Sequence, residues 1–508
     1  MLPITEGKAR RMVTANAAAQ ILVASNRGPV SFREEDDGTL TLRRGGGGLV
    51  SGLSAIGHGE SSPSSVWVCA ALSDADRRAA RQAPHGRLDA AGHDTGGQAV
   101  RMLDIDPGTF DRAYNGVANS VLWFVHHLLY DTPLKPVFDE DFRREWSSYE
   151  AYNAAFADSL AAEAARGATV LVQDYHLTLT PRMLRERRPD LRIGHFSHTP
   201  WAPPDYYRML PDAIGRQVLT GILGADRAAF LTRRWAGAFA DCCEAVLGAS
   251  VERPADPAAD LAVTHEGRTT RLGVHGLGAD ADFLRSRARK PDVDERLAAL
   301  RSRVGQDDGV PRRTVVRVDR TELSKNIVRG LLAYRHLLRT RPQWRGKVVH
   351  IAFAYPSRQD VPEYRVYTEA VRRVADEINE EFGTESWTPL LLHLDDDFPR
   401  SLAAYRMADV ALVNPIRDGM NLVAKEVPVV SDEGCALVLS REAGAAAELA
   451  EDAVMVNPYD VIATADALHE ALTLPAEERA ARSKRLAAAA TALPPQKWFL
   501  DQLAALTA

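Results

Sequence analysis

The chain has 508 residues, with 62 Lys and Arg against 68 Asp and Glu, so its formal net charge is −6. This balance excludes a generally basic nucleic-acid-binding surface. Since a domain typically has about 150 residues, the length of the chain predicts two to four domains. Apolar residues make up 45% of the chain and charged residues 26%, the usage of an ordinary globular protein. A chain of this size can bury a large core, so we expect no stabilising disulfide or metal.

The cysteines and the apolar runs give expectations about the compartment. Two of the four cysteines are adjacent and none lies in a CxxC pair, which argues against zinc fingers, iron–sulfur sites and secreted disulfide frameworks. We therefore expect buried free thiols and a cytoplasmic location. The chain has no run of about 18 apolar residues, so no membrane span is expected. Residues 1–19 lack the apolar segment of a signal peptide and are expected to form a flexible arm.

Short β-branched runs alternate with Ala-, Leu- and Arg-rich segments along the chain. In the first half, buried parallel strands are predicted at 21–25, 169–173 and 193–197, with helices at 159–167 and 181–189. The pattern then restarts, with strands at 314–318, 348–354, 389–394, 410–414 and 436–440 and helices at 326–339 and 363–382. Two such series predict two doubly wound α/β domains. Their irregular spacing disfavours a TIM barrel.

A Gly-rich connection, residues 273–283, joins the two series. We expect an N-terminal Rossmann-like domain over residues 20–275 and a C-terminal one over residues 276–480. The Ala-rich segment 481–508 is expected to be a helix that packs back on the N-terminal domain.

Four glycines, Gly45 to Gly48, follow the first predicted strand and precede Leu49. Glycine lets backbone N–H groups approach an anion closely, and a following helix adds the positive end of its dipole. The pattern is neither GxGxxG nor a Walker motif, and a mobile surface loop explains it equally well.

Arg320 and Lys325 lie five residues apart across a predicted strand-to-helix turn. Both can point to the carboxyl edge of the sheet, where ligands of open α/β sheets bind. A planar guanidinium and an ammonium together suit a diphosphate. By spacing alone, two exposed basic residues at a helix start are an equal alternative.

A second candidate site follows the strand at 410–414. Gly419 permits a sharp turn, after which the backbone N–H groups of residues 420–423 open a helix and form a second anion site. Asp418 lies before that helix, where its carboxylate can face a sugar hydroxyl or cap the helix. Glu426 lies one to two turns into the helix and can reach a ribose diol, pair with Lys425 or face solvent.

Several motifs of this sequence, taken together, resemble the trehalose-6-phosphate synthase family of retaining glycosyltransferases. They run in the family's order from about residue 20 to residue 475: SNRGP, the Gly-rich loop, VQDYHL, HTPW, VDRTELSK, PIRDGMNLVAKE and LSREAGAAAEL…VNPYDV. The resemblance implies the GT-B fold, an α/β architecture in which two Rossmann-like doubly wound domains face each other across a cleft. It implies acceptor binding by the N-terminal domain, nucleotide-sugar binding by the C-terminal domain, and no metal or cofactor.

The resemblance also implies roles for individual residues of this chain. Arg320 and Lys325 clamp the diphosphate, Asp418 holds the transferred glucose, and Asp174 and His198 line the sugar site. Further donor contacts come from Gly47, Gly48, Met420, Asn421, Leu422, Val423 and, at the ribose, Glu426. The acceptor phosphate is held by Arg27, Tyr114, Trp123 and Arg358, since guanidinium forks and a phenol suit a phosphomonoester. By residue type alone, core packing explains His198 and Trp123 better.

The loop 393–401 falls where the family binds the donor base. Guanine presents two adjacent donors, N1–H and N2–H₂, that one carboxylate can accept, whereas uracil and adenine present no such pair. Asp396 therefore favours GDP-glucose over UDP- or ADP-glucose, with Phe398 stacking on the ring and Ser401 adding a hydrogen bond. A solvated acidic loop is the equal alternative.

The implied reaction transfers glucose with retention from a nucleotide-glucose donor to glucose 6-phosphate, giving α,α-trehalose 6-phosphate. The resemblance offers no carboxylate nucleophile beneath the anomeric carbon, so front-face substitution is expected, with the leaving phosphate taking the acceptor proton. No nucleic-acid or membrane partner is expected, and assembly into a homo-oligomer stays open.

The sequence departs from the family's commonest pattern at a few positions: Asn326, the segment 427–429, and the segment 68–72. Two alternatives therefore stay open. One is a pseudo-glycosyltransferase that couples cyclitol units, and the other is a non-catalytic sugar-phosphate sensor of the same fold. Intact SNR and RDGMNLVAKE motifs favour true sugar transfer.

Overall fold

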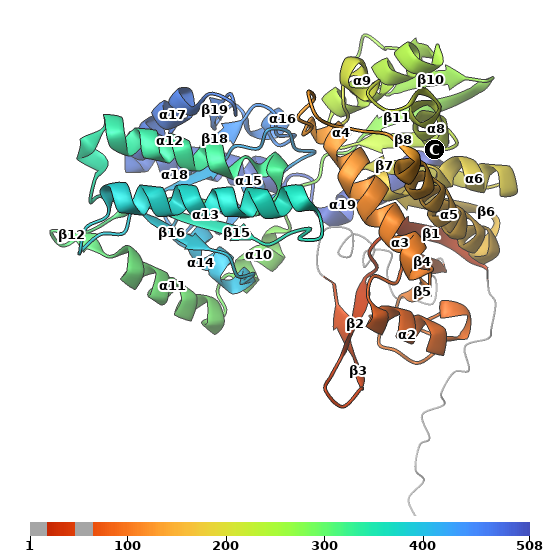
Figure 1. The fold of residues 1–508 in the computed structure, drawn as a ribbon, viewed down its shortest axis with the longest axis horizontal. Coiled ribbons are helices and arrows are strands. Elements are labelled where there is room, and N and C mark those ends of the chain that lie inside the picture. The colour runs from red at the N-terminus through yellow and green to blue at the C-terminus, as the bar shows by residue number, and fades with distance from the viewer. Residues whose placement is uncertain (1–17, 46–63, 508) are drawn as a thin grey trace, which may run out of the picture.

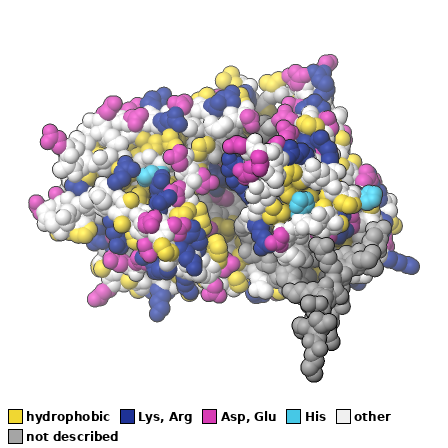
Figure 2. Space-filling model, turned by 90° about the horizontal axis from the view of Figure 1, so that it is seen from below, with side chains coloured by type: hydrophobic (Ala, Val, Ile, Leu, Met, Phe, Trp, Pro, Cys, Tyr) yellow, Lys and Arg dark blue, Asp and Glu magenta, His cyan; other side chains and the backbone are white. Residues whose placement is uncertain are grey.

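The computed structural model describes residues 18–45 and 64–507. The predicted N-terminal arm, up to residue 17, and the predicted donor contacts Gly47 and Gly48 lie outside the described residues. Two lobes are present, each built on its own sheet (Figure 1). On the face seen in Figure 2, basic and acidic side chains are intermixed over both lobes, which agrees with the small net charge.

The first lobe contains a nine-stranded sheet in the order β5-β4-β1-β6-β7-β8-β11-β10-β9. Its pairs are parallel except those of β10 with β9 and β11. The strands are β1 (Ala19–Ser25), β4 (Ser65–Ala70), β5 (Ala99–Leu103), β6 (Ala164–Gln173), β7 (Arg192–Ser197), β8 (Arg227–Phe230), β9 (Ser250–Glu252), β10 (Leu261–His265) and β11 (Arg268–Val274). A separate hairpin, β2 (Val30–Glu34) and β3 (Leu40–Arg44), lies beside the sheet in Figure 1.

The helices of the first lobe include a long one, α5 (Glu140–Glu163), and an irregular π-helical segment at Arg112–Leu122. The others are α2 (Asp74–Gln82), α3 (Pro107–Asp111), α4 (Trp123–His127), α6 (Thr180–Arg187), α7 (Pro204–Tyr207), α8 (Asp212–Ile222) and α9 (Arg233–Cys242). The predicted helix at 159–167 is wrong in its second half. The helix ends at Glu163, and Ala164 is already extended at the start of β6.

The second lobe contains a six-stranded parallel sheet in the order β16-β15-β14-β17-β18-β19. Its strands are β14 (Arg313–Arg320), β15 (Val348–Tyr355), β16 (Leu390–His393), β17 (Val410–Val413), β18 (Ala436–Ser440) and β19 (Val454–Val456), with a small hairpin of β12 (Gln306–Asp307) and β13 (Val310–Pro311). Its helices are α10 (Ala281–Arg287), α11 (Pro291–Val304), α12 (Ile327–Thr340), α13 (Pro362–Phe382), α14 (Phe398–Met407), α15 (Val423–Val430), α16 (Ala446–Leu449), α17 (Val461–Thr473) and α18 (Ala476–Thr491).

The chain passes twice between the lobes, and the two passages are bonded to each other. Gly278 N donates to Leu493 O at 2.7 Å, and Ala279 N donates to Ala490 O at 2.8 Å. A Cβ at Gly278 would lie 2.6 Å from Leu493 O, so only glycine allows this approach. These contacts join the Gly-rich connection to the end of the chain.

The segment predicted as one helix over 481–508 is divided in the structure. Prolines at 494 and 495 separate α18 from α19 (Pro495–Thr507). The first of these helices packs on α15 of the second lobe, whereas α19 lies against β6 and β7 of the first lobe, where Figure 1 marks the C-terminus. The four cysteines are buried and free, as predicted. No helix within the described ranges combines the length and hydropathy that a membrane span needs.

Candidate active site

The predicted basic pair, Arg320 and Lys325, and the predicted loop with Asp418 meet at the carboxyl edge of the second sheet. Arg320 ends β14, Lys325 ends a short 3-10 turn that follows it, and Asp418 lies in the loop between β17 and α15. Lys325 Nζ lies 2.6 Å from Asp418 Oδ2. Asn421 Nδ2 donates to the same oxygen at 3.1 Å. Two motifs that are far apart in sequence therefore form one polar cluster.

Burial and charge act against each other at this ion pair. Burial alone would raise the pKa of Asp418, but the Lys325 ammonium outweighs it and holds the pKa below its usual range. Burial alone would lower the pKa of Lys325, but the carboxylates of Asp418, Glu322 and Asp319 outweigh it and raise the pKa. Both groups are therefore charged at neutral pH, and the ammonium is ready to meet an anion.

Asn326 explains one departure from the family's commonest pattern. Its backbone is left-handed, with φ +58°, a conformation that glycine adopts freely and asparagine tolerates. Its side-chain amide donates to Asn414 O at 3.0 Å and to Pro458 O at 2.7 Å. Asparagine thus keeps the turn after Lys325 and ties it to the neighbouring loops.

Close packing requires glycine in the Asp418 loop, at Gly419, and in the LSREAGAAAEL motif, at Gly444. A Cβ at Gly419 would lie 1.9 Å from His198 O of the first lobe, and one at Gly444 would lie 1.8 Å from Gly419 O. Gly444 N donates to Asp418 O at 3.0 Å. The LSREAGAAAEL motif therefore packs against the Asp418 loop and fixes its backbone. The sequence pattern did not predict this role.

The donor residues predicted from the backbone surround the start of α15. Met420 is buried and its carbonyl accepts from Ala445 N at 2.7 Å, while Asn421 is left-handed at φ +77°. Leu422 immediately precedes α15 and Val423 is its first residue. The first N–H groups of this helix therefore face the Asp418 loop, as an anion site needs.

Arg320 is held by a buried carboxylate that sequence reasoning missed. Its side chain is 57% exposed, and its Nη2 lies 3.1 Å from Oε1 of Glu322, whose own side chain is fully buried. Ser357 Oγ donates to the same oxygen at 3.3 Å. Within the described residues, Glu322 Oε2 has no hydrogen-bond partner. The position lies in the VDRTELSK motif, but only the fold shows what it contacts.

Hydroxyl groups line the region next to Arg320. Tyr355 is the register neighbour of Arg320 in the sheet and shares a hydrogen bond with Ser401. Tyr405 donates to Glu426 Oε2 at 3.3 Å, and burial raises the pKa of Glu426. The tyrosines were not predicted, because their place beside the site depends on β15 and α14 coming together.

The three successive aspartates after β16 have different surroundings. Asp397 caps α14 by accepting from Arg400 N at 2.9 Å and pairs with Arg296 at 2.9 Å. Asp396 is exposed and forms no ion pair or hydrogen bond within the described residues. Burial raises the pKa of Tyr355 to about 12, and the charge of Asp396 adds to this effect. Phe398 is exposed on the rim, stacked with Phe283 at 6.4 Å between ring centroids.

The first lobe brings Asp174 and His198 together. Asp174 follows β6 with a left-handed φ of +72°, and its Oδ1 accepts from His198 N at 3.2 Å. His198 Nε2 donates to Gln173 Oε1 at 3.0 Å. Burial lowers the pKa of His198 and raises that of Asp174. The Asp174 carboxyl group and the His198 imidazole are therefore neighbours in the first lobe.

The predicted acceptor residues gather around aromatic rings. The Arg358 guanidinium lies 4.0 Å from the Trp123 ring centroid, and its nitrogens donate to Tyr364 Oη at 2.6 Å and Tyr175 Oη at 3.1 Å. This arrangement is a half-buried cation with two phenol partners on an aromatic face. Tyr364 and Tyr175 were not predicted as site residues.

His176 connects the remaining acceptor residues. Tyr114 stacks on its ring at 5.6 Å. Burial, followed by the positive charges of Arg358 and Arg27, lowers the pKa of His176 to about 3. The positive charges of both guanidinium groups therefore act on His176, and two such groups suit a phosphomonoester.

His127 lies next to Trp123, one of the predicted acceptor residues. Its ring stacks on Trp123 at 3.8 Å. Burial lowers its pKa to about 3, and the charges of Asp418, Lys325 and Arg358 also act on it. Residues from both lobes thus converge on one site. Within the described ranges, no group of three or more His, Cys, Asp or Glu side chains is arranged to hold a metal ion.

Two Rossmann-like lobes that meet at one site are the architecture of the GT-B fold. The sequence model of glycosyltransferase family 20 matches residues 19–508, and the chain belongs to this family. The predicted family and fold are confirmed.

Relatives with assigned names cover almost the whole chain. The α,α-trehalose-phosphate synthase [UDP-forming] of Schizosaccharomyces pombe is 32% identical over 93% of this chain and 87% of its own. The trehalose-6-phosphate synthase of Mycobacterium avium is 34% identical over 96% of this chain and 95% of its own.

Solved structures agree with the fold. The E. coli protein bound with UDP-2-fluoro glucose superposes with a TM-score of 0.80 at 28% identity, covering 96% of this chain and 98% of that chain. An α,α-trehalose-phosphate synthase (UDP-forming) from Burkholderia xenovorans in complex with glucose 6-phosphate gives 0.80 at 26% identity, covering 96% and 100%.

Proposed function

We propose that this protein transfers glucose with retention from a nucleotide-glucose donor to glucose 6-phosphate, forming α,α-trehalose 6-phosphate and a nucleoside diphosphate. The observation that carries the proposal is that the Arg358 guanidinium lies on Trp123 of the first lobe, while the loop of the Lys325–Asp418 pair packs against His198 of the same lobe. A phosphorylated acceptor held at Arg358 reaches a glucosyl group held at the pair. Relatives named trehalose-phosphate synthases, including one with glucose 6-phosphate bound, support the same reading.

In this proposal each lobe binds one substrate. Arg320 and Lys325 hold the diphosphate, Asp418 holds the transferred glucose, and Asp174 and His198 hold the same sugar from the other lobe. The other donor contacts are Gly47, Gly48, Met420, Asn421, Leu422, Val423 and, at the ribose, Glu426. The acceptor contacts are Arg27, Tyr114, Trp123 and Arg358.

The chemistry follows from the charges at the site. The bond from the anomeric carbon to the diphosphate oxygen breaks, and Arg320 and Lys325 stabilise the negative charge that grows on the diphosphate. The acceptor hydroxyl attacks the same face of the sugar, and its proton passes to the departing phosphate oxygen. Glucose is thus transferred with retention, and no covalent enzyme intermediate is formed.

An assay of nucleoside diphosphate release tests the function. We expect release from UDP-, GDP- or ADP-glucose only when glucose 6-phosphate is present, with an α,α-linked disaccharide phosphate as product by NMR. Release of nucleoside diphosphate that does not depend on glucose 6-phosphate would contradict the proposal. Release that requires a cyclitol acceptor would favour the pseudo-glycosyltransferase. Binding of both substrates without any turnover would favour the sensor.

We propose GDP-glucose as the preferred donor. Asp397 is occupied as a helix cap, whereas the neighbouring Asp396 carboxylate is exposed. The same segment leads to Ser401, which shares a hydrogen bond with Tyr355, the sheet neighbour of Arg320. A free carboxylate there can accept both adjacent donors of guanine. Relatives such as the S. pombe protein are named UDP-forming, so this preference would distinguish the present chain from them.

Replacement of Asp396 by leucine is expected to abolish the preference for GDP- over UDP-glucose. A two-point contact to a base is worth about 1–3 kcal/mol, so the ratio of kcat/KM values falls by about tenfold or more. The matched control is Asp395→Leu, which removes an exposed neighbouring carboxylate and leaves the ratio as it was. An unchanged ratio in the Asp396 variant, or an equal change in both, would reject this base site.

A further inference from the structure

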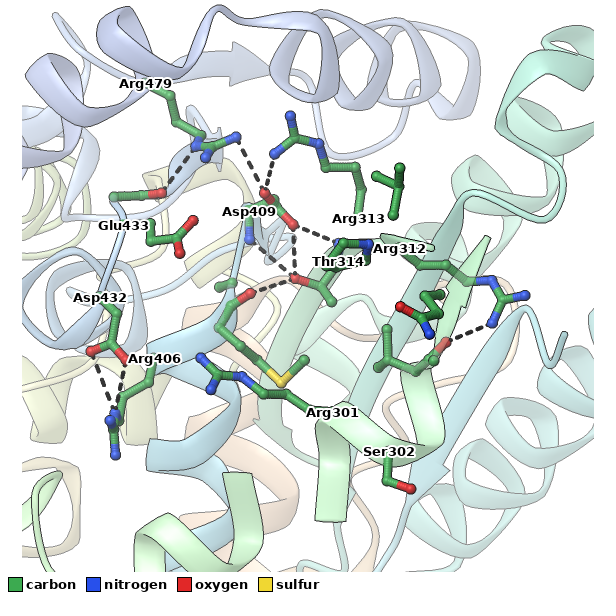
Figure 3. Close-up of a pocket in the computed structure, with 18 residues that line it drawn as sticks. Arg301, Ser302, Arg312, Arg313, Thr314, Arg406, Asp409, Asp432, Glu433 and Arg479 are labelled. Carbon is green, nitrogen blue, oxygen red and sulfur yellow. Dashed lines mark hydrogen bonds and ion pairs between the residues drawn. The ribbon is translucent and has the colours of Figure 1, made fainter. Parts of the chain in front are cut away.

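A cavity lies at the opposite edge of the same sheet from the active site. It has a volume of about 840 Å³ and lies at the amino ends of β14 and β17, and we call it the amino-edge cavity (Figure 3). The hairpin of β12 and β13 borders it, together with the ends of α11 and α14 and the loop after α15. Its volume falls in the range of small-molecule sites, about 300–1,000 Å³.

The lining of this cavity carries an excess of positive charge. Five arginines line it, against three acidic residues. The arginines are Arg301, Arg312, Arg313, Arg406 and Arg479, and the acidic residues are Asp409, Asp432 and Glu433. A concave surface of one sign concentrates ions of the opposite sign, so the cavity attracts an anion.

The individual contacts show which charges are uncompensated. Arg313 and Arg479 share the single carboxylate of Asp409, at 2.6 and 3.2 Å. Arg312 donates to three backbone carbonyls at 2.7, 2.9 and 3.0 Å, and within the described residues it pairs with no carboxylate. Arg301 is exposed, and no dashed line reaches it in Figure 3. The guanidinium groups of Arg312, Arg313 and Arg479 are therefore held in position. Their three positive charges exceed the single negative charge of Asp409.

One part of the lining is apolar. Val304, Val310, Pro311 and Met407 lie on the same cavity as the arginines. An inorganic ion would leave this part uncovered. A phosphate group attached to a sugar or a ring would place its charge on the arginines and its body against these side chains.

We propose that the amino-edge cavity binds a phosphate ester with at least two negative charges, as a ligand additional to the donor and the acceptor. This ligand also contacts the two helices that lead to the donor site. The helix α14 starts at Phe398, beside Asp396, and ends at Met407 in the cavity, and α15 runs from the Asp418 loop to the loop with Asp432 and Glu433. A ligand that shifts either helix changes donor affinity, and the donor changes the affinity of the ligand by the same factor.

Binding is tested by calorimetry in a Lys325→Ala/Arg358→Ala double variant, which lacks two cations of the active site. The probes are inorganic pyrophosphate and adenosine 5′-monophosphate. We expect the nucleotide to bind at one site, and Arg301→Glu in that background to weaken it at least tenfold, about the effect of 1.4 kcal/mol. The matched control is Arg143→Glu, an exposed arginine of α5 in the other lobe, which leaves binding unchanged. Absence of binding by both probes, or equal binding with Arg301→Glu, would overturn the proposal.

A second measurement applies even where the double variant does not fold. The KM for the nucleotide-glucose donor is measured in the parent enzyme and in Arg301→Glu, with and without adenosine 5′-monophosphate. Since Arg301 is far from the substrates, direct competition at the active site shifts both enzymes equally. We expect a larger shift in the parent, and an equal shift in both enzymes would refute the cavity as the site.

Discussion

Lys325→Ala is expected to lower kcat by about 100-fold or more, because the lost ammonium stabilises charge that grows as the glycosyl bond breaks. The ion pair with Asp418 at 2.6 Å places this ammonium at the carboxyl edge of the sheet before any donor arrives. Its contribution belongs to the transition state more than to the ground state, so kcat falls more than donor affinity does. Steady-state kinetics with the preferred donor, together with donor binding by calorimetry, separate the two effects.

The same substitution also leaves the Asp418 carboxylate without its cation, and this must be separated from catalysis. Breaking a buried ion pair from one side costs about 3 kcal/mol of unfolding free energy. Lys425→Ala is the matched control, since Lys425 is fully buried and its Nζ lies 2.7 Å from Glu448 Oε2. In our proposal this pair does not contact the diphosphate. Urea unfolding should show similar losses in both variants, whereas kcat should fall much further in Lys325→Ala. Turnover near the parent value in Lys325→Ala would reject the diphosphate role.

The strands of the second lobe were predictable because a parallel sheet covered by helices buries both faces. β15 and β18 are almost entirely buried, and their residues are nearly all apolar. Several strands of the first lobe were not predicted. β8 has four residues, one of them arginine, and β5 mixes arginine with methionine, so neither gives a periodic signal long enough to separate it from a loop.

The site was predictable where one motif carries both the residue and its local geometry. Arg320, Lys325 and Asp418 lie at strand ends, and strand ends of parallel sheets meet at one edge. Glu322, Tyr355 and His127 were missed because their importance depends on contacts across elements. The distinction between Asp396 and Asp397 has the same origin, since only the start of α14 shows which carboxylate is used as a cap.

Arg358→Ala is expected to raise the KM for glucose 6-phosphate by about 100-fold, since two charge-assisted hydrogen bonds to a phosphate are lost. The guanidinium rests on Trp123 at 4.0 Å and is oriented by Tyr364 and Tyr175, so no neighbouring cation can take its place without moving these rings. Arg358→Lys keeps the charge but not the planar fork, and an intermediate KM is expected.

Unphosphorylated glucose as acceptor separates a phosphate contact from a general loss of structure. The parent enzyme should prefer glucose 6-phosphate strongly, and Arg358→Ala should lose most of that preference while its activity with glucose changes little. Arg358 lies on the second lobe and Tyr175 on the first, so this contact also joins the two lobes at the acceptor. Equal losses of activity with both acceptors would show that Arg358 orders the site without binding the phosphate. The acceptor phosphate would then have to bind elsewhere than at Trp123 and Arg358.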